Sequence, residues 1–187
     1  QMKATGEVMS VGRTFEESLL KAIRSLETGV NHLYMQKFEA EKTESLMDYI
    51  KIGTDDRIYA IAELLRRGVE VAVIAAETRI DRFFLDKMKK IVDMEKELKQ
   101  CPGDMAVLYQ AKRNGFSDKA IAWLWSKKET DIFKMRKDAH IFPVYKMIDT
   151  CASEFKSYVP YFYSTYEIEN ESVIEDRKKI IVLGSGP

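Results

Sequence analysis

Apolar residues recur at helical spacing across the first three quarters of the sequence, and this pattern restricts the chain to a mainly α-helical fold. The first periodic segment follows Thr14 and Glu17, which have the spacing of a capping box. Apolar residues then fall on one face of the predicted helix: Phe15, Leu19, Ala22, Ile23 and Leu26. A second, longer stripe contains Ile80, Phe84, Met88, Ile91, Met94 and Leu98. Both segments are therefore predicted to bury one face against other helices.

Glycine, proline and polar residues divide the rest of this region into shorter predicted helices. The predicted N-caps are Thr54, Thr78 together with Asp81, and Ser126 together with Glu129 as a second capping box. The predicted helices cover residues 43–50, 54–67, 70–76, 78–100, 104–113, 117–124 and 126–138, with an aperiodic connection at 33–42. The fold class is thus predicted to be mainly α, an orthogonal bundle of short helices with extended N- and C-terminal border segments and a terminal β-strand.

The pattern changes after Pro143, where the helical period disappears. Residues 144–166 are rich in aromatic and β-branched residues and are interrupted by Pro160, so they are predicted to be extended and docked on other structure. Residues 178–183 form a continuous apolar run that predicts a buried terminal β-strand, which leads into a glycine turn at 184–186. Such a strand normally begins a βαβ unit, so we expect the chain to be a fragment of a longer protein.

Composition excludes several classes of function. Thirty Lys plus Arg residues balance thirty Asp plus Glu residues, so no global field draws the protein to nucleic acid or to an anionic membrane. The longest uncharged runs fall far short of the roughly 20 apolar residues that span a bilayer, and no signal peptide is recognisable at the start. We therefore expect a cytoplasmic protein with no membrane partner.

The residue types that build catalytic and metal sites are sparse. Cys101 and Cys151 lie far apart, as do His32 and His140, whereas a zinc site needs about four such ligands at suitable spacing. Both cysteines are expected to be reduced. There is no Ser, His and Asp set and no glycine-rich lysine loop, and the acidic pairs at 16–17 and 55–56 suit helix caps better than an acid and a base. No catalytic, cofactor-binding or metal-binding residue is predicted, and the fragment alone is expected to be inactive.

A helix-turn-helix unit that binds nucleic acid is the alternative hypothesis. Residues 116–122 and 126–132 resemble its two helices, and residues 101–140 contain eight Lys plus Arg against five Asp plus Glu, a net charge of +3. However, Glu129 and Asp131 lie at the end that would read the bases and would repel phosphate. Packing of Ile121, Leu124, Ile132 and Met135 explains the same pattern without nucleic acid. Trp123 and Trp125 point to opposite helix faces, so at least one is expected near the surface.

Several stretches together resemble one family, the large chain of carbamoyl-phosphate synthase. They are residues 2–13 (MKATGEVMSVGR), 143–155 (PVYKMIDTCASEF), 163–167 (YSTYE) and 180–187 (IIVLGSGP), and residues 81–85 and 115–118 also fit. They occur in the order found in that family, whose large chain has two ATP-grasp synthetase halves joined by an all-helical oligomerisation domain. The resemblance covers the whole sequence and implies that the chain represents this joint.

The resemblance implies a division of the chain into four parts. Residues 1–29 would be the tail of the first ATP-grasp unit, and residues 30–143 the helical oligomerisation domain. Residues 144–177 would form the extended connector, and residues 178–187 the truncated first strand of the second half. The implied function is a non-catalytic structural and oligomerisation module.

The resemblance also implies the chemistry of the complete enzyme. It would make carbamoyl phosphate from bicarbonate, glutamine-derived ammonia and two ATP, for pyrimidine and arginine synthesis. ATP and magnesium or manganese would be cofactors of the complete enzyme, held outside this chain. The implied partners are the remaining large-chain domains, the small glutaminase chain and a second copy of the module, without nucleic acid.

Overall fold

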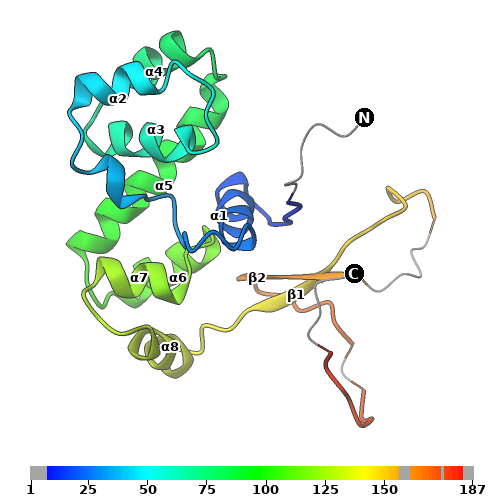
Figure 1. Ribbon diagram of the computed structural model, residues 1–187. Coiled ribbons are helices and arrows are strands. Elements are labelled where there is room, and N and C mark those ends of the chain that lie inside the picture. The colour runs from blue at the N-terminus through cyan, green and yellow to red at the C-terminus, as the bar shows by residue number, and fades with distance from the viewer. Residues whose placement is uncertain (1–7, 156–160, 174, 183–187) are drawn as a thin grey trace.

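The computed structural model describes residues 8–155, 161–173 and 175–182 of the 187-residue chain. The described part contains eight α-helices and one two-stranded sheet, which confirms the mainly α prediction (Figure 1). The elements are α1 (Phe15–Ser25), a 3-10 turn η1 (Gln36–Phe38), α2 (Thr43–Tyr49), α3 (Arg57–Arg66), α4 (Val71–Thr78), α5 (Arg82–Gln100), α6 (Met105–Arg113), α7 (Asp118–Leu124), α8 (Glu129–Asp138), β1 (Val144–Met147) and β2 (Phe162–Thr165). None of the described helices is both long and apolar enough to cross a lipid bilayer.

The long helix α5 is the centre of the fold. It contacts α1, α3, α4, α6 and α7, so that α2–α4 lie near one end of it and α6–α8 near the other (Figure 1). One hydrophobic core runs through both groups of helices and through α1 and α5. Fully buried residues of α1, α3, α5, α6, α7 and α8 belong to it, in that order Leu20, Leu64, Leu85, Leu108, Ile121 and Ile132. Because α1 contributes to this core, it packs as part of the helical body.

Helix starts follow the predicted capping residues in some places. The Thr14 hydroxyl accepts a hydrogen bond from the Glu17 N–H at 3.1 Å, which confirms the first predicted cap. Asp81 also caps α5, because its carboxylate accepts from the Phe83 N–H at 2.8 Å. The predicted connection at 33–42 contains only the turn η1.

Three predicted caps are wrong, and each is replaced by a residue further along the chain. The helix predicted from Thr54 begins only after Asp56. Thr78 is the last residue of α4, because Arg79 adopts a left-handed φ of 57° that separates α4 from α5. Ser126 has a φ of 53° and remains in the turn, so α8 begins at Glu129 and the predicted capping box does not form.

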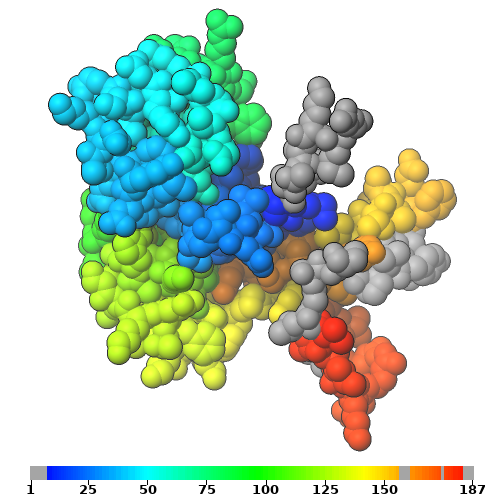
Figure 2. Space-filling view, viewed as in Figure 1, coloured from blue at the N-terminus to red at the C-terminus, as the bar shows by residue number. Residues whose placement is uncertain are grey.

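The chain after α8 leaves the helical body as an extended arm (Figure 2). Strands β1 and β2 pair antiparallel, with Val144 opposite Thr165 and Met147 opposite Phe162. The extended prediction for residues 144–166 is confirmed in these two segments, whereas residues 150–155 form turns and bends. Beyond β2 the chain returns along β1, where the Glu171 N–H donates to the Tyr145 carbonyl at 2.8 Å.

The predicted terminal strand is not formed in residues 178–182, the part of it that the structure describes. Ile180, Ile181 and Val182 are 91%, 84% and 85% exposed. A strand needs a hydrogen-bonded neighbour, and no described segment pairs with these residues. Leu183 and the predicted glycine turn at 184–186 lie outside the described residues.

Candidate functional site

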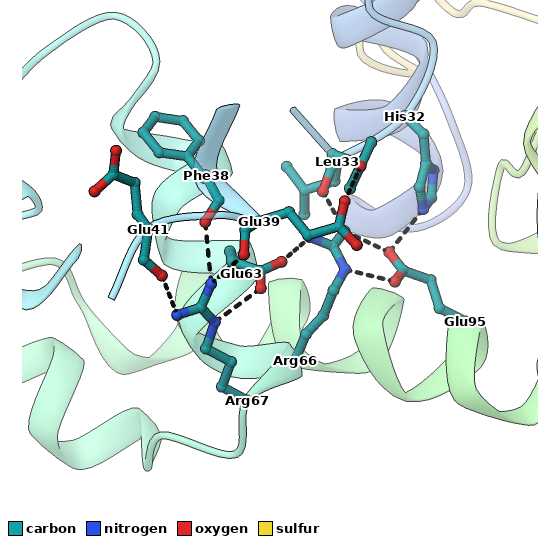
Figure 3. Close-up of polar contacts among 10 residues, drawn as sticks. His32, Leu33, Phe38, Glu39, Glu41, Glu63, Arg66, Arg67 and Glu95 are labelled. Carbon is teal, nitrogen blue, oxygen red and sulfur yellow. Dashed lines mark hydrogen bonds and ion pairs between the residues drawn. The ribbon is translucent and has the colours of Figure 1, made fainter. Parts of the chain in front are cut away.

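A buried network of ion pairs joins the connection after α1 to helices α3 and α5 (Figure 3). Glu95 of α5 is at its centre and is only 2% exposed. One carboxylate oxygen lies 2.8 Å from His32 Nε2 and accepts from Arg66 Nη2 at 2.8 Å, and the other accepts from Arg66 Nε at 2.7 Å. The Glu95 carboxylate thus holds the connection after α1 and helix α3 on helix α5.

Two consecutive arginines at the end of α3 extend this network. Arg66 also donates to the carbonyl of Leu33. Arg67 pairs with Glu63 at 2.8 Å and donates to the carbonyls of Glu41, Phe38 and Glu39 at 2.7, 3.0 and 3.1 Å (Figure 3). Because both side chains satisfy main-chain oxygens of residues 33–41, this aperiodic connection is fixed on the helices.

The Glu95 carboxylate is held in its charged form. Burial by itself would raise the pKa of Glu95, but the hydrogen bonds from Arg66 and His32 and their charges lower it from 4.5 to about 2. The group is therefore an ionised structural anchor and is poorly suited to proton transfer near neutral pH.

A second network joins α6, α7 and α8. The two Asp118 oxygens accept from Lys112 Nζ and from Arg136 Nε, both at 2.7 Å, and Lys112 Nζ also donates to the Phe116 carbonyl at 2.8 Å. Burial lowers the pKa of Lys112, although the charge of Asp118 opposes this shift. The network holds the start of α7 between its two neighbouring helices.

The segment considered for nucleic-acid binding is packed as a small helical subassembly. Ile121 and Ile132 are fully buried between α7 and α8, as the packing explanation predicts. Trp125 is buried and donates from Nε1 to the Leu98 carbonyl at 2.7 Å, whereas Trp123 is 47% exposed, which confirms the prediction for the two tryptophans. Binding of nucleic acid by this segment stays a prediction.

A third contact fastens the extended arm to α1. Glu17 is 1% exposed, and one oxygen accepts from the Arg13 N–H at 2.7 Å and from the Thr165 hydroxyl at 3.1 Å. Its other oxygen pairs with Lys21 at 2.8 Å, and Lys21 in turn donates to the Ser164 carbonyl at 2.5 Å. The residue predicted as a helix cap therefore also holds β2 on the helical body.

No catalytic, cofactor-binding or metal-binding residue is predicted from the sequence. In residues 8–155, 161–173 and 175–182, no group of three His, Cys, Asp or Glu side chains is arranged to hold a metal ion. Cys101 is exposed and Cys151 is half-buried, and both are free thiols. The Glu95 network is not predictable from periodicity, because Glu95 lies 63 residues from His32 and 29 from Arg66.

The fold and its three polar networks define a helical scaffold module, whose charged groups tie segments together. Residues 7–140 match the family model described as the carbamoyl-phosphate synthetase large chain, oligomerisation domain. The match covers well over half of the 187 residues, and the chain therefore belongs to this family. It is a structural module of that family. The matched segment includes α1, which shares the core of the other helices, and ends just after α8.

Proposed function

We propose that this chain is a non-catalytic spacer and association module of the carbamoyl-phosphate synthase large chain. The observation that carries the proposal is the family match over one continuous helical core. Support also comes from Glu95, Asp118 and Glu17, three buried or half-buried carboxylates that tie distant segments together. A spacer needs this rigidity, because a separation between two catalytic units is useful only if it is maintained.

In the complete enzyme, the module would hold two ATP-grasp synthetase halves at a fixed separation. A labile intermediate would then pass between them without escaping to water. The enzyme would make carbamoyl phosphate from bicarbonate, glutamine-derived ammonia and two ATP. ATP with magnesium or manganese would be bound by the synthetase halves and would supply phosphoryl groups there.

The proposed partners follow from this role. They are the other domains of the large chain, the small glutaminase chain and a second copy of this module, in the cytoplasm. Nucleic acid and membranes are not among them. A fluorescence titration with duplex DNA at about 50 mM salt tests that point, because binding that weakens steeply with salt would favour the helix-turn-helix alternative.

Light scattering over a wide range of protein concentration tests self-association. We expect a discrete dimer or higher oligomer that persists on dilution. A monomer at every concentration would contradict an association surface within this chain and would leave only the spacer role.

An activity assay tests the non-catalytic part of the proposal. The purified chain, given ATP, magnesium, bicarbonate and ammonia, should form no carbamoyl phosphate. The complete large chain under the same conditions is the positive control. Turnover by the isolated module would contradict the proposal.

A further inference from the structure

A polar cavity of about 260 Å³ lies where α1, the turn between α6 and α7, α8 and β2 meet. In Figure 1, α1 and β2 lie near the centre of the view, with α6 and α7 to the left of β2 and α8 below them. Four basic side chains line the cavity, namely Lys21 and Arg24 from α1, Lys112 from α6 and Arg136 from α8. The family match does not assign this cavity a role.

The two lysines in the cavity already have partners. Lys21 pairs with Glu17 at 2.8 Å and donates to the carbonyls of Val11 and Ser164 at 2.9 and 2.5 Å. Since an ammonium group has three donors, Lys21 has none left. Lys112 pairs with Asp118 and donates to the Phe116 carbonyl. Lys112 therefore uses two of its three donors, and its charge is already paired with Asp118.

The two arginines have unused donors. Arg24 makes one hydrogen bond, from Nη1 to the Gly115 carbonyl at 2.9 Å, and no carboxylate of the described residues forms an ion pair with it. Burial lowers the pKa of Arg24, opposed by the charge of Glu17. Arg136 uses Nε for Asp118 and Nη1 for the Ile141 carbonyl, which leaves Nη2 without an acceptor in the described part of the chain. Each guanidinium group carries five donors, so both have capacity for a ligand.

Charge points to the kind of ligand. The acidic residues in the lining are Glu17, Asp118 and Glu129, one fewer than the basic residues. The Glu17 oxygens are occupied by Lys21, Thr165 and the Arg13 N–H, and Asp118 is shared between two cations. Glu129 is exposed and forms no ion pair with another described residue. The partly buried side of the cavity therefore has an excess of positive charge, which favours an anion.

We propose that this cavity binds a small oxyanion, with a phosphate or carboxylate group received by the guanidinium groups of Arg24 and Arg136. Guanidinium groups match the oxygens of both anions in a bidentate manner. A volume of about 260 Å³ is below the range typical of drug-sized ligands, so inorganic phosphate or a short carboxylic acid is the expected size. The bound anion would join α1 to α8. This inference does not rest on the proposed function.

Calorimetric titration of the whole chain with inorganic phosphate and with succinate tests the proposal, with sodium chloride at equal ionic strength as the reference. We expect saturable binding of at least one oxyanion. Arg24→Gln should weaken it by about tenfold or more, because a charge-assisted hydrogen bond is lost. Glu129→Gln should strengthen it, because a competing negative charge is removed. Lys96→Gln removes an exposed cation of α5 outside the cavity and should leave the affinity unchanged.

The two probes also distinguish the chemical class of the ligand. Tighter binding of phosphate would indicate a phosphate group, and tighter binding of succinate would indicate a carboxylate group. Heat effects no larger than those of chloride would overturn the proposal, as would unchanged affinity in Arg24→Gln. Circular dichroism must first show that this variant is folded, because Arg24 also supports Gly115. If it is not folded, the exposed Glu129→Gln variant decides, and unchanged affinity in that variant would overturn the site.

Discussion

At the scale of single residues, Glu95 joins three segments of the chain that lie far apart in the sequence. It lies on the apolar side of α5 beside Met94, and both residues are buried. Its carboxylate receives a guanidinium group from α3 and an imidazole from the connection after α1. A buried carboxylate is tolerated only when such partners compensate it, and the partners depend on it in the same way.

Glu95→Gln should destabilise the protein strongly. Removing one member of a buried charge network leaves Arg66 without its main counter-ion, and we expect a loss of about 3–5 kcal/mol in the free energy of unfolding. Urea denaturation followed by circular dichroism measures this loss. Asp93→Asn is the matched control, because its side chain is 47% exposed and should change stability by no more than about 0.5 kcal/mol. Equal effects of the two substitutions would contradict the role assigned to Glu95.

Stability should also depend on pH through Glu95. Its pKa is lowered from 4.5 to about 2 in the folded protein, so the folded state binds fewer protons than the unfolded state between these values. The contribution is therefore complete above about pH 4.5 and is lost as the pH falls toward 2. Urea denaturation of the natural protein and Glu95→Gln from about pH 6 to pH 3 should show their difference in stability shrinking. A difference that stays constant would contradict this prediction.

At the scale of elements, the turn between α6 and α7 controls how closely α1 approaches. Gly115 has a φ of 88°, and a Cβ atom there would lie 2.7 Å from the Cα of Glu17. Gly115→Ala should therefore combine backbone strain with a steric clash and cost about 2–4 kcal/mol of unfolding free energy. Thermal and urea denaturation measure this loss.

Gly103 provides the control for the turn. Its φ is 91°, but nothing lies within 4 Å of a Cβ built there, so Gly103→Ala isolates the backbone strain and should cost only about 1 kcal/mol. An equal loss of unfolding free energy in both alanine variants would show that the steric clash between α1 and residue 115 does not affect stability.

Polar contacts from Thr165, Ser164 and Glu167 fasten the extended arm to the helical body. Thr165→Val keeps the side-chain volume but removes the hydroxyl that donates to Glu17 at 3.1 Å. We expect faster amide hydrogen exchange in residues 144–147 and 162–165, with little change in the helices, because local opening follows local contacts. Ser164→Ala is the control, since Lys21 contacts only the main-chain carbonyl of Ser164. Unchanged exchange in Thr165→Val would contradict the fastening role of this hydroxyl.

At the scale of the whole molecule, one core predicts one unfolding transition for the helical body. Trp125 reports on the junction of α7 with α5 through its bond to the Leu98 carbonyl at 2.7 Å. In a Trp123→Phe variant, fluorescence of Trp125 and circular dichroism should give coincident urea transitions. Separate transitions would show that the helices on the two sides of α5 unfold independently.

Helix positions were largely predictable, because a helix that buries one face carries apolar residues at helical spacing along the local sequence. The Thr14 cap is one example, and the stripe of α5 is another, since Met88, Ile91, Met94 and Leu98 are buried as predicted. Phe84 of the same stripe is 45% exposed, and Ile80 lies before the start of α5. Some helix starts were not predictable from local signals. Asp81 rather than Thr78 caps α5, because Arg79 between them adopts a left-handed conformation. Ser126 is also left-handed and therefore does not act as the predicted cap of α8. A capping residue acts only if the backbone on both sides has the required conformation.

The sequence by itself determined the fold class, the order of the helices, the extended region after α8 and, through its resemblance, the family that the match identifies. Only the tertiary structure decided which charges are buried together, such as Glu95 with Arg66, and which cations remain without a carboxylate, such as Arg24. Helical periodicity reports which face of one element is apolar. Pairing of charges depends on where separate elements meet, and that geometry arises only when the core is packed.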